Sequence, residues 1–551
     1  MLRKWSTLKK SSFIEGTFIA TLAIVLVKIM GMLYVIPFYA IVGATGAALY
    51  SYAYNIYNIF LDISTVGLPI AISKITNEFH TLKMYDAKKR AYEIAIKIMR
   101  FISVAIFIIL FFFAYPIASF IIGDLTGGNT KEAVTAVIRT VSLAILVIPY
   151  LSVAKGYLQG HNVINISSIS NVLEQVVRIL VIIVGSFLAI KVFHLSYVVG
   201  VMIALSGAFF GGLVSYFYVK HKMNKNKKEL GLVAQKKKDK ITNKEITKKL
   251  ASYAIPYVII NSVSSLYSFV DMILVLRGLE LMGYATSDIE FISSSISTWA
   301  GKINMIVISI AMGMTISLIP SIVHAYTLKK WDDVNNKINA SFKIITFVSL
   351  PMAIGLSLLS SEVWQVFYGA NDIGASILSV SVFVAVSLNF YMITSSIMQS
   401  LNKYKTVYIA TICGFVSNAL FDIPLMYLLK FIGLPAYIGP LVSSIIGYML
   451  SVFINLRTIK KEEKQINYKD SLKTIGKILV PSLSMFVIIF VLKNIIPFAA
   501  TSRLSAILII IFYAIIGVII YGGISYKMGL LDEVLEKNIL NKITKKLKHQ
   551  A

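Results

Sequence analysis

Residues 13–42 read FIEGTFIATLAIVLVKIMGMLYVIPFYAIV. About 20 predominantly apolar residues are enough to carry a helix across the ~30 Å hydrocarbon core of a bilayer. This run is too long for the apolar core of a secretory signal peptide, and no small-residue cleavage site follows it. Comparable segments recur along the chain as far as residue 526 and bring the total to fourteen. The sequence therefore predicts an all-α polytopic membrane protein with 14 transmembrane helices.

The overall composition favours the same class. Hydrophobic residues make up 57% of the chain and charged residues 14%, which lies outside the range of soluble globular proteins. The chain has one cysteine, Cys413, which lies in an apolar segment. A single cysteine excludes an internal disulfide and a cysteine-based metal cluster.

The placement of the 53 Lys and Arg residues predicts the orientation. Most of them lie in the even-numbered loops and in the two tails, so the positive-inside rule predicts an inner-membrane protein with both termini in the cytoplasm. The net charge of +27 does not indicate a nucleic-acid site, because the longest basic stretch has no interleaved aromatic residues to stack on bases. That stretch is expected to be a solvated cytoplasmic linker attracted to anionic lipid.

The linker falls after the sixth span and divides the chain into similar parts. QGHN at 159–162 parallels QSLN at 399–402, which indicates two pseudo-symmetric six-helix lobes followed by two C-terminal helices. Gly207 and Gly211 in span 6 predict close helix packing. The predicted domains are an N-lobe at 1–219, the Lys-rich linker at 220–251, a C-lobe at 252–457, helices 13 and 14 at 458–527, and an amphipathic cytoplasmic tail at 528–551.

Ionisable residues inside the spans are candidates for function, because a charge in hydrocarbon costs several kcal/mol unless it is paired or faces water. Lys28 and Lys302 have no opposite charge one turn away, so they are expected to face a ligand; the alternatives are snorkelling and a pair with Asp62. Glu174 and Arg178 are spaced i, i+4, which predicts a structural pair.

Three further residues define a candidate cation site. Asn418 and Asp422 are spaced i, i+4 on span 11 and, with Asp271 of span 7, could supply hard oxygen ligands to a small cation. The alternative is that the two carboxylates pair with nearby Lys or Arg. Spacing alone leaves both interpretations open.

Sequence motifs of enzymes are absent from the chain. It contains no G-x-x-x-x-G-K-[ST] loop, no H-E-x-x-H motif and no G-x-S-x-G elbow. We therefore expect a transporter driven by an ion gradient or by the membrane potential, and not an enzyme.

Several segments resemble a known family. They are similar to the polysaccharide-type flippases of the multidrug/oligosaccharidyl-lipid/polysaccharide (MOP) exporter superfamily, and in particular to the Gram-positive branch of MurJ-like lipid II flippases. The resemblance covers the whole chain, and its motifs are more specific for the branch than for the substrate. The segments are GTF (16–18), KIMGMLY (28–34), VGATGAALY (42–50), VIRTVSLA (137–144), KGYLQG (155–160) and VLEQVVR (172–178).

The resemblance implies a fold and a function. It implies two lobes around a cationic cavity, with helices 13 and 14 adding a groove for a lipid tail. It also implies that a lipid-linked peptidoglycan precursor, an undecaprenyl-pyrophosphate-linked glycan, moves from the inner to the outer leaflet by alternating access. Cell-wall synthesis enzymes and membrane lipids are the implied partners, with no cofactor except Na⁺ as a coupling ion.

The family's functional positions map onto individual residues here. Lys28 and Lys302 correspond to its basic residues on helices 1 and 8, and Asp271, Asn418 and Asp422 to its sodium site. Gram-negative members have further Arg where this chain has Tyr34 and Asp62, for which Arg178 or Arg277 could compensate. Flipping of another undecaprenyl-linked glycan, cation-coupled drug export and a scaffold role without transport remain the alternatives.

Overall fold

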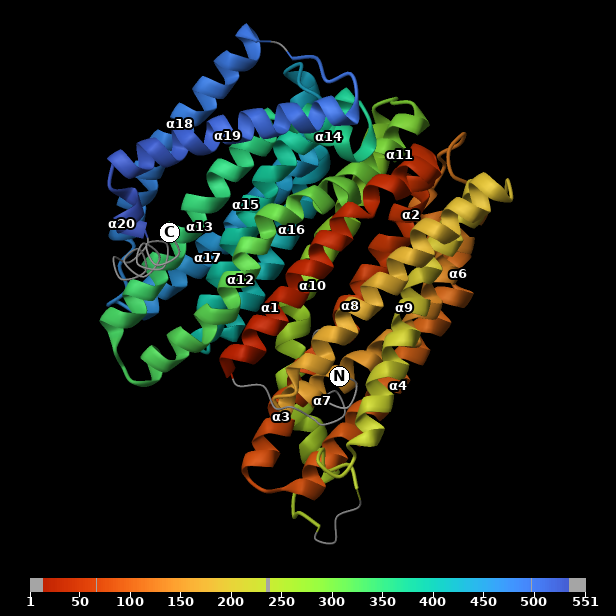
Figure 1. Cartoon of the computed structure of the whole chain (residues 1–551), viewed down its shortest axis with the longest axis vertical. Coiled ribbons are helices and arrows are strands. Elements are labelled where there is room, and N and C mark those ends of the chain that lie inside the picture. Colours follow the sequence, from red (N-terminus) through yellow and green to blue (C-terminus); the bar gives the residue numbers. More distant parts are fainter. Residues whose placement is uncertain (1–12, 66, 234–237, 497, 535–551) are drawn as a thin grey trace, which may run out of the picture. The chain divides into compact units, whose positions relative to one another are not determined.

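The computed structural model describes residues 13–65, 67–233, 238–496 and 498–534. Within these ranges every regular element is a helix, which confirms the predicted all-α class (Figure 1). Contacts divide the chain into two compact units, the first ending at Thr298 and the second beginning at Trp299.

Eleven α-helices lie wholly within the described part of the first unit. Two π-helical turns, η2 (Val181–Gly185) and η3 (Leu188–Val192), follow the eighth of them, and a third, η4 (Ser295–Trp299), ends the unit. The helices are α1 (Phe13–Leu33), α2 (Val35–Thr65), α3 (Gly67–Thr81), α4 (Tyr85–Phe112), α5 (Ala114–Ile122), α6 (Lys131–Ile145), α7 (Ile148–Gly160), α8 (Ile164–Leu180), α9 (Tyr197–Lys225), α10 (Asn243–Leu281) and α11 (Thr286–Ser294).

The second unit continues the pattern with long helices joined by short turns. One 3₁₀ turn, η5 (Ala436–Ile438), precedes α17. The helices of its described residues are α12 (Ala300–Thr327), α13 (Trp331–Leu358), α14 (Ser360–Tyr368), α15 (Asp372–Ser400), α16 (Tyr404–Phe431), α17 (Gly439–Glu462), α18 (Lys469–Ile495), α19 (Arg503–Lys527) and α20 (Leu530–Val534).

The number of spans agrees with the sequence. By length and composition, 13 segments of the described residues could cross a membrane, and one of them, Ala23–Thr81, has 59 residues. At ~1.5 Å per residue such a segment is long enough to cross twice. Its helix breaks at Gly43, where φ is 70° and ψ is −177°. Glycine adopts this conformation without steric strain, so the break separates the first two predicted spans.

The connection between α9 and α10 is shorter than the predicted linker at 220–251, because α9 ends at Lys225 and α10 begins at Asn243. A capping box of Thr242 and Glu245 starts α10. Before it, Asp239 Oδ2 accepts a hydrogen bond of 2.8 Å from the Ala87 amide in the first turn of α4. Arg90 of α4 donates to the Asp239 carbonyl at 3.1 Å. The described part of the connection is therefore docked on α4.

The compact units do not follow the predicted lobes. The helices α10 and α11, which the sequence assigns to the C-lobe, pack on α2, α3 and α4 of the first unit. The lobe division rests on a repeat in the sequence and stays a prediction. Of the predicted tail helix at 528–551, only α20 and its immediate surroundings lie in the described residues, and there Leu530 and Val534 pack on Ile478 of α18.

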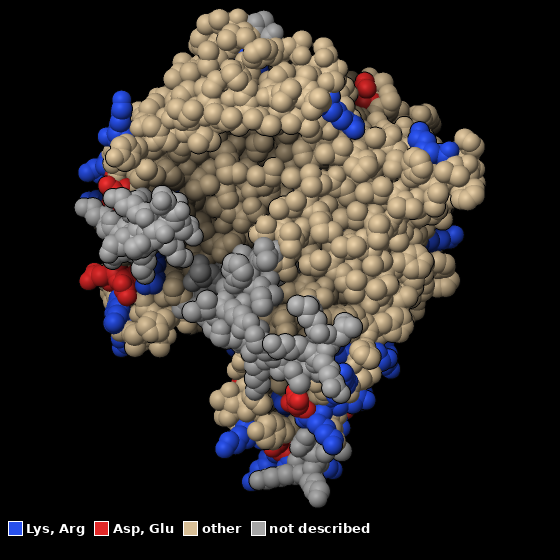
Figure 2. All heavy atoms as spheres, in the orientation of Figure 1, with Lys and Arg blue, Asp and Glu red and all other residues tan. Residues whose placement is uncertain are grey.

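Charged residues gather at the ends of the helices. In Figure 2 the Lys and Arg of the first unit cluster where α3 and α9 end and α4 begins, while the sides of its helices show few. An uncharged belt of this kind is what a lipid-facing helix bundle needs.

Candidate functional site

Arg178 of α8 faces tyrosine rings of α2. Its guanidinium carbon lies 6.0 Å from the ring centroid of Tyr54 and 5.9 Å from that of Tyr57. Tyr50 stacks on Tyr54 with 5.3 Å between centroids, and the hydroxyls of Tyr34 and Tyr50 are 3.5 Å apart. Ring faces attract cations without neutralising them. Because no carboxylate in the described part of the chain reaches Arg178, its charge remains available to an anion.

Two glycines of α9 fix the position of the Arg178 backbone. A Cβ at Gly207 would lie 2.9 Å from the carbonyl oxygen of Arg178, and a Cβ at Gly211 would lie 2.5 Å from that of Glu174. Only glycine allows the two helices this approach, which confirms the predicted close packing. After Leu180 the chain continues as η2, and π-helical turns are frequent beside functional residues.

The predicted pair of Glu174 and Arg178 is wrong. Lys155 Nζ in the middle of α7 is 2.8 Å from Glu174 Oε2 and 2.8 Å from Asn171 Oδ1. The i, i+4 spacing permits the local pair, but a cation from a neighbouring helix takes the carboxylate while the tyrosine rings take the guanidinium. Among the described residues, Arg178 is therefore left without a carboxylate partner.

Lys28 belongs to the same pair of helices as Arg178. It is half-buried on α1, one turn before Gly31, and a Cβ at Gly31 would lie 3.3 Å from Gln175 Nε2 on α8. Gln175 in turn is one turn before Arg178. The structure therefore brings both predicted substrate-binding cations of the first unit to the α1–α8 contact.

Asp62 and Arg277 each join two helices of the first unit. Asp62 accepts a hydrogen bond from Ser265 of α10, and this contact, not Lys28, is the one found for it among the described residues. Arg277 at the end of α10 donates to the carbonyl of Phe120 on α5 at 2.7 Å and lies 3.4 Å from Glu280. Neither geometry leaves the side chain turned toward a ligand, and Arg277 mainly holds the C-terminal end of α5.

The other predicted residues are divided between the units. Lys302 is half-buried on α12 of the second unit, whereas Asp271 is buried on α10 of the first. On α16, Asn418 Nδ2 donates to Asp422 Oδ1 at 3.2 Å and to Ser444 Oγ at 3.1 Å. Asp422 is fully buried, and Asn418 Oδ1 is a buried acceptor with no hydrogen-bond partner in the described part. A carboxylate beside a spare amide oxygen is a donor set that fits Na⁺.

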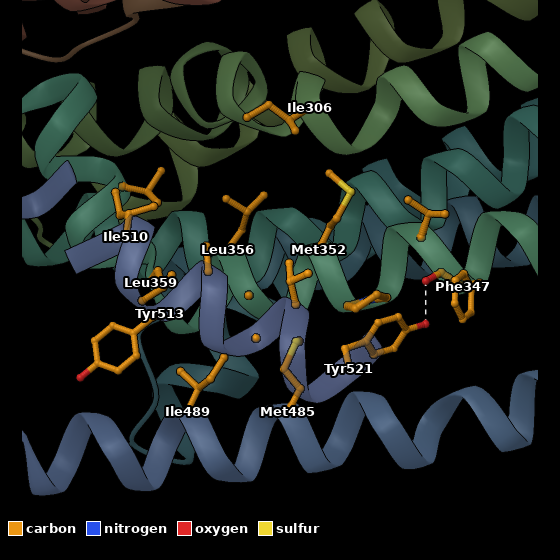
Figure 3. A pocket seen from close by; sticks show the side chains of 17 residues that line it. Ile306, Phe347, Met352, Leu356, Leu359, Met485, Ile489, Ile510, Tyr513 and Tyr521 are labelled. Atoms are coloured by element: carbon orange, nitrogen blue, oxygen red, sulfur yellow. Dashed lines mark hydrogen bonds between the residues drawn. The ribbon is translucent and has the colours of Figure 1, made fainter. Parts of the chain in front are cut away.

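An apolar cavity of about 430 Å³ lies in the second unit. Its walls come from α13, α14, α18 and α19, with Ile306 of α12, and Figure 3 shows Met352, Leu356, Met485 and Ile489 converging on it. We call this cavity the apolar groove. Gly517 of α19 also lines it and provides part of its width.

Hydrogen bonds fix the two ends of the apolar groove. At one end the Tyr521 hydroxyl donates to the Phe347 carbonyl at 2.7 Å, seen as the dashed line in Figure 3. At the other end Lys493 of α18 lies 2.8 Å from the buried carboxylate of Glu362 on α14 and donates to the Leu358 carbonyl at 2.9 Å. These contacts hold α18 and α19 against α13 and α14.

Sequence reasoning missed a buried carboxylate in the first unit. Glu290 of α11 is 3% exposed and accepts hydrogen bonds of 2.9 Å from both the backbone and the side-chain nitrogen of Asn129. No local spacing marks this pair. The tyrosines around Arg178, by contrast, carried a signal, because Tyr50, Tyr54 and Tyr57 are spaced i, i+4, i+7 on one helix face.

Comparisons with known proteins agree with this architecture. Residues 13–286 match the polysaccharide biosynthesis protein family, and residues 292–423 match the MatE family. The chain is 29% identical to the lipid II flippase MurJ of Bacillus subtilis (strain 168) over 96% of its own length and 98% of the relative's, and 23% identical to stage V sporulation protein B of the same organism over 82% and 84%.

Solved structures show the same fold. A lipid II flippase MurJ in an inward closed conformation superposes with a TM-score of 0.64 at 19% identity, over 93% of this chain and 99% of that one. An inward-facing multidrug resistance transporter of the MATE family superposes with a TM-score of 0.61 at 16% identity, over 79% and 96%.

Proposed function

Because this chain belongs to the MOP exporter superfamily, whose members similar to it are transporters and not enzymes, we propose that it flips a lipid-linked peptidoglycan precursor, lipid II, across the bacterial cytoplasmic membrane. The substrate moves from the inner to the outer leaflet by alternating access. An ion gradient or the membrane potential drives the cycle. Both termini lie in the cytoplasm, where cell-wall synthesis enzymes deliver the precursor.

The apolar groove is the observation that carries this proposal. A polyprenyl pyrophosphate has a headgroup that cannot cross hydrocarbon and a tail that need not leave it. Its carrier must enclose the headgroup and guide the tail. A groove lined by Met352, Leu356, Met485 and Ile489 suits the tail. A carrier of small drugs encloses its whole cargo and has no use for such a groove. The curated MurJ relative, which matches 96% of this chain, supports the same reading.

The basic residues inside the helices are proposed to bind the pyrophosphate headgroup. Arg178, with its fork of donors and no carboxylate within reach among the described residues, binds a phosphate of the headgroup, and Lys28 of the same unit adds a second positive charge. Lys302, on the second unit, remains a predicted substrate-binding residue. Asn418 and Asp422 bind Na⁺, which supplies a positive charge that biases one conformation of the cycle over the other. The buried carboxylate of Asp271, on the first unit, is a further residue on which we expect the sodium dependence to rest.

The experiment blocks the tail and leaves the headgroup residues intact. In Gly517→Phe the new ring enters the apolar groove, since a Cβ there already lies 3.2 Å from Ile489 and 3.4 Å from Met485. Gly523→Phe is the matched control on the same helix, because its Cβ meets nothing within 4 Å. Cells depleted of the parent protein and given either variant are compared for membrane abundance, growth and accumulated precursor.

We expect Gly517→Phe, at normal abundance, to leave lipid II accumulating in the inner leaflet, while Gly523→Phe supports growth. Mass analysis of the accumulated lipid separates lipid II from another undecaprenyl-linked glycan. Full activity of Gly517→Phe would remove the groove from the transport path. If cells with Gly517→Phe lose resistance to a cationic drug and accumulate no lipid II, the protein is better explained as a drug exporter.

A further inference from the structure

A second, basic pocket lies at the lysine-rich end of the first unit, away from Lys28 and Arg178. It has a volume of about 250 Å³ and lies between α4, α7, α9 and the start of the α9–α10 connection. Its rim carries the ammonium groups of Lys89, Lys220 and Lys227. The proposed transport of lipid II uses none of these residues.

The interior of the basic pocket is apolar and aromatic. Its apolar and aromatic lining comes from Ala154, Met223, Leu232, Tyr92 and Tyr216. The Tyr92 ring packs on Tyr157 with 4.6 Å between centroids, which fixes that part of the lining. A phosphate at the rim would therefore meet cations on one side and have apolar carbon beneath it.

The α9–α10 connection completes the pocket and is itself anchored. The Tyr157 hydroxyl donates to the Leu230 carbonyl at 2.7 Å, and Leu230 is 1% exposed. This contact holds the neighbouring Leu232 in the lining of the pocket and sets the path of the chain just after Lys227. The pocket thus depends on the tertiary fold and not on one helix.

The charges of the basic pocket do not balance. Among the described residues that line it, Glu93 is the one carboxylate against three ammonium groups. It lies 3.7 Å from Lys89, and both side chains are solvated, with 26% and 52% exposure, so the pair is weak. Lys220 lies over the Tyr216 ring at 5.5 Å, which leaves its charge intact. Two positive charges remain for a ligand.

The same face of α4 continues as a place for an acyl chain. Lys97 and Arg100 follow Lys89 and Glu93 at helical spacing, and beyond them the exposed apolar side chains Phe101, Val104 and Ile108 line a shallow depression of about 450 Å³. A basic cluster followed by an apolar strip matches a molecule with an anionic head and a hydrocarbon tail.

We propose that the basic pocket binds the headgroup of an anionic glycerophospholipid of the inner leaflet, whose acyl chain lies along α4. The bound phosphate joins Lys89 of α4, Lys220 of α9 and Lys227 of the connection. It therefore fastens the segment that links α9 to α10 and makes the stability of this end of the first unit dependent on lipid charge.

The test titrates the purified full chain in detergent with phosphatidylglycerol, with phosphatidylcholine and with soluble glycerol phosphate, using thermal unfolding and native mass spectrometry. The variant is Lys89→Gln/Lys220→Gln/Lys227→Gln. The matched control is Lys460→Gln/Lys461→Gln/Lys464→Gln, which removes three exposed lysines from the second unit. A further variant, Phe101→Ala, shortens the apolar strip without changing charge.

We expect phosphatidylglycerol to stabilise the parent and the control, and to bind the pocket variant about 100-fold more weakly, as removal of three juxtamembrane cations predicts. Phe101→Ala should weaken the binding of phosphatidylglycerol but leave the binding of glycerol phosphate unchanged. If the pocket variant and the control lose the same affinity for phosphatidylglycerol, the lipid is attracted by surface charge in general and the proposed site is wrong. Equal affinity for glycerol phosphate and phosphatidylglycerol would overturn the lipid as its ligand.

Discussion

Replacing Arg178 with methionine is expected to separate anion binding from folding. The variant loses two cation–π contacts, each worth about 0.5–2 kcal/mol. It also removes a shielded charge whose desolvation costs several kcal/mol, and apolar replacements of buried ions are often neutral. The two effects oppose each other, so the free energy of unfolding should change by less than about 2 kcal/mol.

The same substitution should have a large effect on the substrate. A guanidinium forms two parallel hydrogen bonds with a phosphate, and each charged hydrogen bond is worth about 1.5–3 kcal/mol. The lower limit for two bonds is about 3 kcal/mol, which corresponds to an affinity roughly 100-fold weaker. Arg178→Lys retains the charge but not the fork, and it should fall between the parent and the methionine variant.

The assay combines three measurements on purified protein and on cells. Binding of lipid II in detergent gives the affinity, thermal unfolding gives the stability, and complementation of depleted cells gives the function. Lys155→Gln/Glu174→Gln is the control, since it neutralises a neighbouring pair that already satisfies itself. If Arg178→Met folds normally and binds lipid II within threefold of the parent, the tyrosine-framed cation is not the phosphate site.

Three further outcomes are expected. Gly123→Ala should lower thermal stability by about 1–3 kcal/mol, because φ is +61° there and a Cβ would lie 1.6 Å from Arg277 Nη1; an unchanged unfolding midpoint would contradict this. Asp271→Asn should abolish any sodium dependence of lipid II binding or flipping, and a retained dependence would remove it from the cation site. Burial alone would raise the pKa of Glu533, but hydrogen bonds from Lys477 and Thr474 outweigh burial and lower the pKa below its usual 4.5. The ionised carboxylate therefore stabilises the docking of α20 above pH 4.5. This stabilisation is lost as the pH falls through the lowered pKa. The protection of the α20 amides, measured relative to their intrinsic exchange rate at each pH, should fall over that acidic range in the parent and not in Glu533→Gln.

The number and type of helices could be predicted because hydropathy is a local property. Each span reports its own length, and even the break at Gly43 falls in the glycine-rich stretch between the first two predicted spans. The shape of the linker could not be predicted in the same way. Its composition indicates solvation, but Asp239 finds the amide of Ala87, a residue 152 positions away, and no local pattern records that contact.

The candidate site shows the same limit. Its position inside a predicted span made Arg178 a candidate, but the spacing assigned Glu174 as its partner, because only residues one turn apart can be compared along a sequence. Lys155 and the tyrosines of α2 lie on other helices, and tertiary packing decided between them. The apolar groove was implied by resemblance, and its lining could be assigned to residues only when α13, α18 and α19 were seen together.

The contacts that close both ends of the apolar groove affect which lipids of the surrounding bilayer can enter it. With Lys493 tied to Glu362 at one end and Tyr521 tied to the Phe347 carbonyl at the other, the walls cannot spread easily. Under the proposed function, a carrier lipid with one isoprenoid chain would fit between these walls more readily than a phospholipid with two acyl chains. The width of the apolar groove would then add to the headgroup contacts in selecting which lipid is moved.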